Sequence, residues 1–135
     1  MSHTRLRRYN ARDAFPEQNL DNDFCQAVIA GNTVYLRGQV AQDLDTRESL
    51  ATGDPAGQAE HLMNNVEVLL AEAGSRLEDI CRITVYVTDP RLREKVGEVR
   101  ARYLKEPFPA STFLVVSGLA RPELLLEIEA TAHVG

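Results

Sequence analysis

The sequence predicts an α+β fold in two layers, with two helices packed on one face of a β-sheet. One segment near residues 54–74 and another that begins at Asp89-Pro90 repeat apolar residues at the three-and-four spacing of an amphipathic helix. Five or six other segments show strand-like alternation. A helix between two similar strands implies some parallel pairing. The length of 135 residues suits one domain, which we place at residues 1–135.

The chain begins with a predicted short strand at Thr4–Tyr9, followed by a polar connection at Asn10–Asp23. This connection is rich in turn-forming and charged residues and contains Pro16, so we expect a loop. A β-hairpin is predicted at Phe24–Gln39, because the Gly31-Asn32 pair is typical of a two-residue turn.

Counting outward from that turn gives the expected register of the hairpin. The predicted pairs are Ala30 with Thr33, Val28 with Tyr35, Gln26 with Arg37, and Phe24 with Gln39. The mostly apolar face is expected to cover the core and carries Cys25, Ala27, Ile29, Val34, Leu36 and Gly38. The opposite face has an arginine, two glutamines and two aromatic rings, a composition that suits the wall of a ligand site.

After a polar loop at Val40–Gly53, Asp54 and Pro55 form a helix start, with the aspartate as N-cap and the proline at the first helical position. Gly74 is expected to end this helix. Its apolar stripe is expected to face the core and consists of Ala59, Leu62, Met63, Val66, Leu69, Leu70 and Ala73.

The second half of the chain predicts three strands and one helix. The strands are expected at Arg82–Thr88, Ser111–Ser117 and Leu124–Val134. The helix after Asp89-Pro90 carries its apolar face on Leu92, Val96, Val99 and Tyr103. The sheet face away from the helices would retain the apolar side chains of Phe24, Tyr35, Leu114 and Val116. A bare apolar face of this kind indicates association, so we expect a homo-oligomer.

Composition restricts the classes of function. The net charge of -5 argues against nonspecific attraction to nucleic acid or to anionic membranes. No apolar run approaches the length of a membrane span, and no secretory signal is visible, so we expect a cytoplasmic protein. Cys25 and Cys81 are expected to be buried, reduced thiols, and no residue spacing predicts a metal site.

An ordered series of short motifs runs along nearly the whole chain. The motifs are Gly31–Gln39, Asn65-Val66, Ala73-Gly74, Leu77–Ile80, Thr84–Asp89, Phe108–Ala110 and Leu126–Ala130. In this order they resemble the reactive intermediate deaminase (Rid, YjgF-like) family, whose older label is endoribonuclease L-PSP. The resemblance implies a chorismate-mutase-like subunit with a mixed six-stranded sheet, which assembles as a homotrimer with ligand clefts between subunits.

The same resemblance implies an activity. Archetypal members hydrolyse enamines and imines to ketoacids and ammonia without a metal or organic cofactor, and relatives include aminomuconate deaminases. Glu127 matches the glutamate that positions the hydrolytic water, so we expect it to be catalytic. Archetypal members clamp the substrate carboxylate with an arginine directly after the Phe-Pro-Ala motif. This sequence has Ser111 at that position, followed by Thr112, and we expect both to contact substrate.

The hairpin supplies the other expected substrate-binding residues. Phe24 stands where the family has a tyrosine, and Arg37 stands where it has a serine, next to Gly38 and Gln39. One interpretation is that Arg37 replaces the missing clamp arginine as the anion-binding group. The other is that Arg37 forms an ion pair with Glu127 or Glu129 across the subunit interface.

Two functions therefore stay open at the level of the sequence. The first is hydrolytic deamination of a small carboxylated metabolite, such as an enamine, an imine or an aminomuconate-like compound. The alternative is a non-catalytic trimer with a small-molecule-binding or regulatory role. Ribonuclease activity is the weakest of the family's functions here, because the chain is acidic and no histidine-based acid–base cluster is visible.

Overall fold

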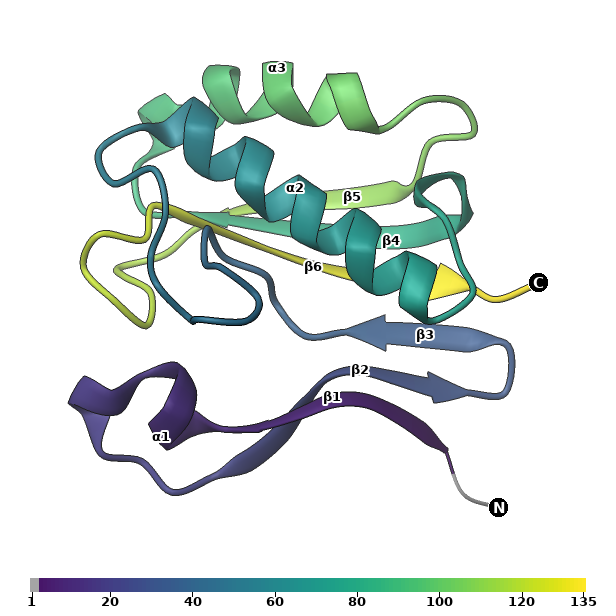
Figure 1. The fold of residues 1–135 in the computed structure, drawn as a ribbon. Helices are drawn as coiled ribbons and strands as arrows, with labels where there is room; N and C mark the ends of the chain where they lie inside the picture. The colour runs from purple at the N-terminus through teal and green to yellow at the C-terminus, as the bar shows by residue number, and fades with distance from the viewer. Residues whose placement is uncertain (1–2) are drawn as a thin grey trace.

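The computed structural model describes residues 3–135 and shows the two expected layers, a sheet with both long helices on one side (Figure 1). The strands are β1 (Thr4–Asn10), β2 (Asp23–Ala30), β3 (Thr33–Leu36), β4 (Ile80–Val87), β5 (Ala110–Val115) and β6 (Leu126–His133). The helices are α1 (Ala11–Ala14), α2 (Pro55–Glu72) and α3 (Arg93–Tyr103). The predicted α+β class with a mixed six-stranded sheet is confirmed.

The sheet has the strand order β1-β2-β3-β6-β4-β5. β4 and β5 are parallel, and the other neighbouring strands are antiparallel. The parallel pair follows from the α3 crossover between these strands, as the sequence predicted. The C-terminal strand β6 lies in the interior of the sheet, between β3 and β4, so its outward-facing side chains are surrounded by neighbours on both sides.

The hairpin turn is confirmed, and its register is correct close to the turn. Gly31 has a φ of +58°, and Ala30 pairs with Thr33. The predicted pair of Phe24 and Gln39 is wrong. Gln39 is paired with Ile128 of β6 instead, because the chain leaves the hairpin after β3 and crosses toward β6.

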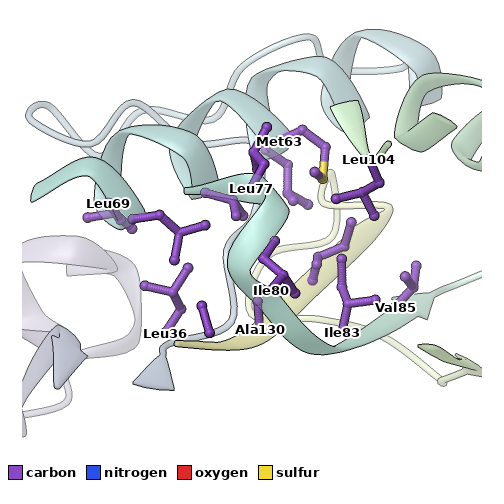
Figure 2. Close-up of a cluster of buried hydrophobic side chains, with 14 of the residues drawn as sticks. Leu36, Met63, Leu69, Leu77, Ile80, Ile83, Val85, Leu104 and Ala130 are labelled. Atoms are coloured by element: carbon purple, nitrogen blue, oxygen red, sulfur yellow. The ribbon is translucent and has the colours of Figure 1, made fainter. Parts of the chain in front are cut away.

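Helix α2 covers the sheet with the predicted apolar stripe. Its N-cap is Asp54, whose Oδ1 accepts a hydrogen bond from the backbone N–H of Gly57 at 3.0 Å. Gly74 follows the helix with a φ of +79°. Figure 2 shows Met63 and Leu69 of this helix among the side chains that form the core with the sheet. All seven residues of the stripe are buried, namely Ala59, Leu62, Met63, Val66, Leu69, Leu70 and Ala73.

Two expectations about local structure need correction. The connection at Asn10–Asp23 contains α1 and a 3-10 turn at Pro16–Gln18 rather than an irregular loop. Asn10 starts α1, because its side chain accepts a hydrogen bond from the backbone N–H of Arg12 at 2.9 Å. Both cysteines are free, but neither is fully buried as expected, because Cys25 is half-buried and Cys81 is exposed.

The predicted bare apolar face is present on the side of the sheet opposite α2 and α3. Phe24 and Tyr35 are each 52% exposed, and Leu114 is 45% exposed. Among residues 3–135, no helix is long and apolar enough to cross a membrane.

Candidate functional site

Glu127 lies on the sheet face opposite the helices. Its neighbours Leu126 and Ile128 are both fully buried in the core, so strand alternation directs Glu127 to the other face. The Glu127 carboxylate lies against the backbone of Gly38, where an added Cβ would overlap the carboxylate oxygen Oε2. Gly38 has no left-handed φ, so the glycine here serves this close approach rather than a turn.

Gln39 explains why Gly38 and Arg37 meet Glu127. The backbone N–H of Gln39 donates to the Ile128 carbonyl at 2.7 Å, and the N–H of Ile128 donates to the Gln39 carbonyl at 3.0 Å. These two bonds hold the segment after β3 on the middle of β6. The residues just before Gln39 are therefore placed beside Glu127, although they are about ninety positions away along the chain.

Gln39 and Gln26 are buried rather than exposed on a ligand wall, which corrects the expectation for that face of the hairpin. Their exposed fractions are 2% and 1%. The Gln39 amide Nε2 donates to Gln26 Oε1 at 2.9 Å and to the Arg37 carbonyl at 3.0 Å. Gln39 thus fixes the position of the Arg37-Gly38 segment through its side chain as well as its backbone.

Replacing Gln39 with leucine is expected to lower the free energy of unfolding by about 1–3 kcal/mol, because Gln26 would keep a buried amide without its partner. Chemical denaturation measures this change. The double variant Gln26→Leu/Gln39→Leu is expected to recover part of the loss, since no buried amide is then left unpaired. If the double variant instead loses as much free energy of unfolding as the two single variants together, the two side chains are not energetically coupled.

The environment of Glu127 favours its protonated form. Burial raises the pKa of Glu127, nearby Arg37 lowers it in part, and the like charge of Glu129 raises it again. Glu129 itself accepts a hydrogen bond from the Tyr86 hydroxyl at 2.6 Å. Within residues 3–135, no donor is hydrogen-bonded to the Glu127 carboxylate. This carboxylate is therefore available to a water molecule or a substrate.

Arg37 lies half-buried between aromatic rings. Its guanidinium carbon is 5.0 Å from the centre of the Tyr9 ring and 5.8 Å from that of Phe15, and its Nη1 donates to the Gly38 carbonyl at 3.1 Å. In the described part of the chain, Arg37 forms no ion pair with Glu127 or Glu129 of its own subunit. The charge of Arg37 lowers the pKa of Glu127 through electrostatic attraction over a distance, without a direct contact.

The aromatic support of Arg37 was not expected from the sequence. Arg47 also lies over the Tyr9 ring at 5.2 Å, and Arg121 lies over the Phe15 ring at 5.0 Å. The Tyr9 and Phe24 rings are 6.0 Å apart. The only signal of this cluster in the sequence is the presence of two aromatic residues, Tyr9 and Phe15, ahead of the hairpin. Tyr9, Arg37 and the exposed Phe24 line a cavity of about 640 Å³.

Ser111 and Thr112 lie away from this group within one subunit. Both are in β5 at the far edge of the sheet, and β4 separates that strand from β6. Ser111 pairs with the buried Ile83, and its hydroxyl accepts a hydrogen bond from Arg100 of α3 at 2.8 Å. One chain thus brings Arg37, Gly38 and Glu127 together, with Phe24 nearby, and holds Ser111 and Thr112 elsewhere.

Among residues 3–135, no group of three or more histidine, cysteine, aspartate or glutamate side chains is arranged so that it could hold a metal ion.

Comparison with known proteins identifies the family. The sequence model of the family described as Endoribonuclease L-PSP matches residues 17–134, which is most of the chain. The chain belongs to the Rid (YjgF-like) family. A RutC-family protein from Pyrococcus horikoshii is 36% identical to this Rid-family chain, over 82% of the chain and 86% of the relative. The 3-aminoacrylate deaminase RutC of Acinetobacter baylyi is 31% identical, over 82% of this chain and 86% of that enzyme.

Solved structures of Rid-family proteins share the fold. The crystal structure of RidA from an Antarctic Psychrobacter species has 32% sequence identity and a TM-score of 0.76, over 82% of this chain and 88% of that one. A YjgF/YER057c/UK114 family member from Mycobacterium tuberculosis has 29% identity and a TM-score of 0.78, over 98% of this chain and 100% of that one. The family that the motifs resembled is thus confirmed.

Proposed function

We propose that this Rid-family chain is a hydrolytic deaminase of a small carboxylated enamine or imine, acting in a cleft completed by a second subunit of a homotrimer. The observation that carries the proposal is the half-buried Glu127 carboxylate, which has a raised pKa and lies against Gly38 beside Arg37. The Acinetobacter relative named as a 3-aminoacrylate deaminase supports deamination as the type of reaction. The cytoplasm is the proposed location.

The reaction needs one water molecule and a group that moves protons. An enamine tautomerises to an imine, which reacts as its N-protonated form. Water adds to the carbon of this iminium ion as Glu127 accepts one proton of the water, and a neutral carbinolamine forms. Glu127 then returns that proton to the nitrogen, the C–N bond breaks, and the hydroxyl group loses its proton to solvent, which releases ammonia and leaves a carbonyl group. A carboxyl group with a raised pKa suits both proton transfers near neutral pH. The positive charge of Arg37 would attract an anionic substrate to the same place.

Ammonia release tests this proposal directly. The purified protein should release ammonia from freshly generated 2-aminoacrylate, 3-aminoacrylate or 2-aminomuconate faster than buffer does, as followed by a coupled glutamate dehydrogenase assay. Rates equal to those in buffer for all three compounds would reject the deaminase. Serum albumin at equal concentration controls for nonspecific amine chemistry.

The pH dependence of the reaction should report Glu127. We expect kcat/KM to rise with pH through an acid limb that lies above the ordinary range of a glutamate, because the active form is the carboxylate and burial raises its pKa. Glu129→Gln should move this limb to lower pH by removing a like charge, and Arg37→Gln should move it to higher pH. A limb that neither variant shifts would show that another group titrates. Initial rates between pH 4 and pH 9 provide the measurement.

A non-catalytic binding protein is the second candidate, and Ser111 is the observation that favours it. A serine hydroxyl cannot form the bidentate, charged contact with a carboxylate that an arginine forms. Under this alternative, the protein binds stable ketoacids but releases no ammonia above the control. In both cases the exposed apolar face with Phe24, Tyr35 and Leu114 supports self-association, which light scattering on a sizing column measures.

A further inference from the structure

Helix α3 lies on the helix side of the sheet (Figure 1), and Arg93 and Arg100 of this helix line a cavity together with Ser111 and Phe113 of β5. Two adjoining cavities open there, of about 480 and about 220 Å³, and both are lined by Gly97, Arg100 and Ser111. The larger one also touches Arg93 and Phe113. The smaller one continues along apolar side chains that include Leu104 and Phe108.

The sequence of α3 builds this groove. Arg93, Gly97 and Arg100 are four and three positions apart, so they share one face of the helix. A Cβ added to Gly97 would meet no atom within 4 Å, which means that the groove is open between the two arginines. Glycine in a helix interior costs about 1 kcal/mol relative to alanine, so the local stability of α3 does not explain it.

The two guanidinium groups lack an acidic partner in their own subunit. Nη1 of Arg100 donates to Ser111 Oγ at 2.8 Å, and the Arg93 guanidinium lies over the Phe113 ring at 5.4 Å. Within the described residues neither arginine forms an ion pair. Burial lowers the pKa of Arg100, and the nearby charge of Arg93 lowers it further. A guanidinium has five N–H donors, so Arg100 retains donors for an anion.

We infer that Arg100, supported by Arg93, binds the carboxylate of the ligand in this groove, while the apolar branch toward Leu104 and Phe108 receives its hydrocarbon part. The contact with Ser111 carries the inference. Arg100 and Ser111 line both cavities, and the hydrogen bond between them fixes the guanidinium where the two cavities adjoin. Arg100 is thus a ligand-binding residue supplied by α3, and because Ser111 lies apart from Glu127 within one subunit, the two groups would meet only in the cleft that the proposed function places between subunits. The inference rests on the proposed function for the identity of the ligand as a small carboxylate.

Equilibrium binding of 2-oxobutanoate, a stable ketoacid, tests the inference by titration calorimetry on the full chain. Arg100→Gln is expected to weaken binding about tenfold to a hundredfold, as the loss of a charged hydrogen-bonded contact predicts. Lys105→Gln removes the same charge from an exposed position just after α3 and should bind like the wild type. Unchanged affinity in Arg100→Gln, or a loss found only in Arg37→Gln, overturns the inference.

A second variant separates binding from folding. Gly97→Leu would fill the groove and improve helix propensity, so we expect binding to be abolished while the melting temperature is kept or raised. Retained binding in this variant would overturn the inference. Light scattering distinguishes an interface role, because a lower oligomeric state of Arg100→Gln with unchanged ketoacid affinity would also overturn it. Binding that depends on Arg100 without any ammonia release would reject the deaminase but keep this site.

Discussion

Replacing Glu127 with glutamine is expected to lower the rate of ammonia release by about a hundredfold to ten-thousandfold, the usual contribution of a positioned acid–base group. Glutamine has nearly the same shape, but it can neither accept a proton from water nor return one to nitrogen. Steady-state kinetics with 2-aminoacrylate measures the change. The KM should change little if Glu127 serves proton transfer rather than substrate binding. A variant with more than a tenth of the wild-type rate would contradict the assigned role.

The same substitution should stabilise the fold at neutral pH, which excludes unfolding as the cause of lost activity. Because the folded pKa of Glu127 is raised, its contribution to stability is fully present below the unfolded pKa and is lost as pH rises through the folded pKa. Glu127→Gln avoids this loss, so its melting temperature should exceed that of the wild type at pH 7. The difference should disappear near pH 4, where the wild-type carboxyl group is largely protonated. A lower melting temperature at pH 7 would contradict the burial of an unpaired carboxylate.

The elements that the sequence predicted well are those whose pattern is long and local. Helix α2 combines an aspartate cap, a first-turn proline, a full apolar stripe and a terminal glycine, and each of these signals depends only on nearby residues. Strand β6 alternates over its whole length. Helix α1 has four residues, too few to show a period, and its cap at Asn10 reads equally well as a turn.

Only two features of the sequence predicted parts of the candidate site, namely strand alternation and the resemblance to a known family. Alternation along β6 directs Glu127 away from the core, and the motif series assigned its role. The burial of Gln39 was missed, because the chain leaves the hairpin plane after Leu36 to pair with Ile128. The contacts of Arg37 with Tyr9 and of Arg100 with Ser111 each depend on tertiary packing between different elements. No local spacing encodes such contacts.

The substitution Gly38→Ala is expected to lower kcat/KM by about a hundredfold while changing the melting temperature little. The new Cβ would overlap the Glu127 carboxylate, which must then move away from its position beside Arg37. The carboxylate is the end of a flexible side chain, so it can move at low cost in stability. A displacement of about 1 Å in a catalytic group is enough for a rate loss of this size.

Gly118→Ala is the matched control, since a Cβ at Gly118 meets no atom within 4 Å and its φ is not left-handed. This variant should keep wild-type kinetics. If Gly38→Ala acts only by moving the carboxylate, then adding it to Glu127→Gln should cause little further loss of activity, because the group that it displaces is already inactive. Independent, additive losses in the double variant would mean that Gly38 contacts the substrate itself. The two single variants and the double variant therefore decide whether the glycine serves the ligand or the position of the glutamate.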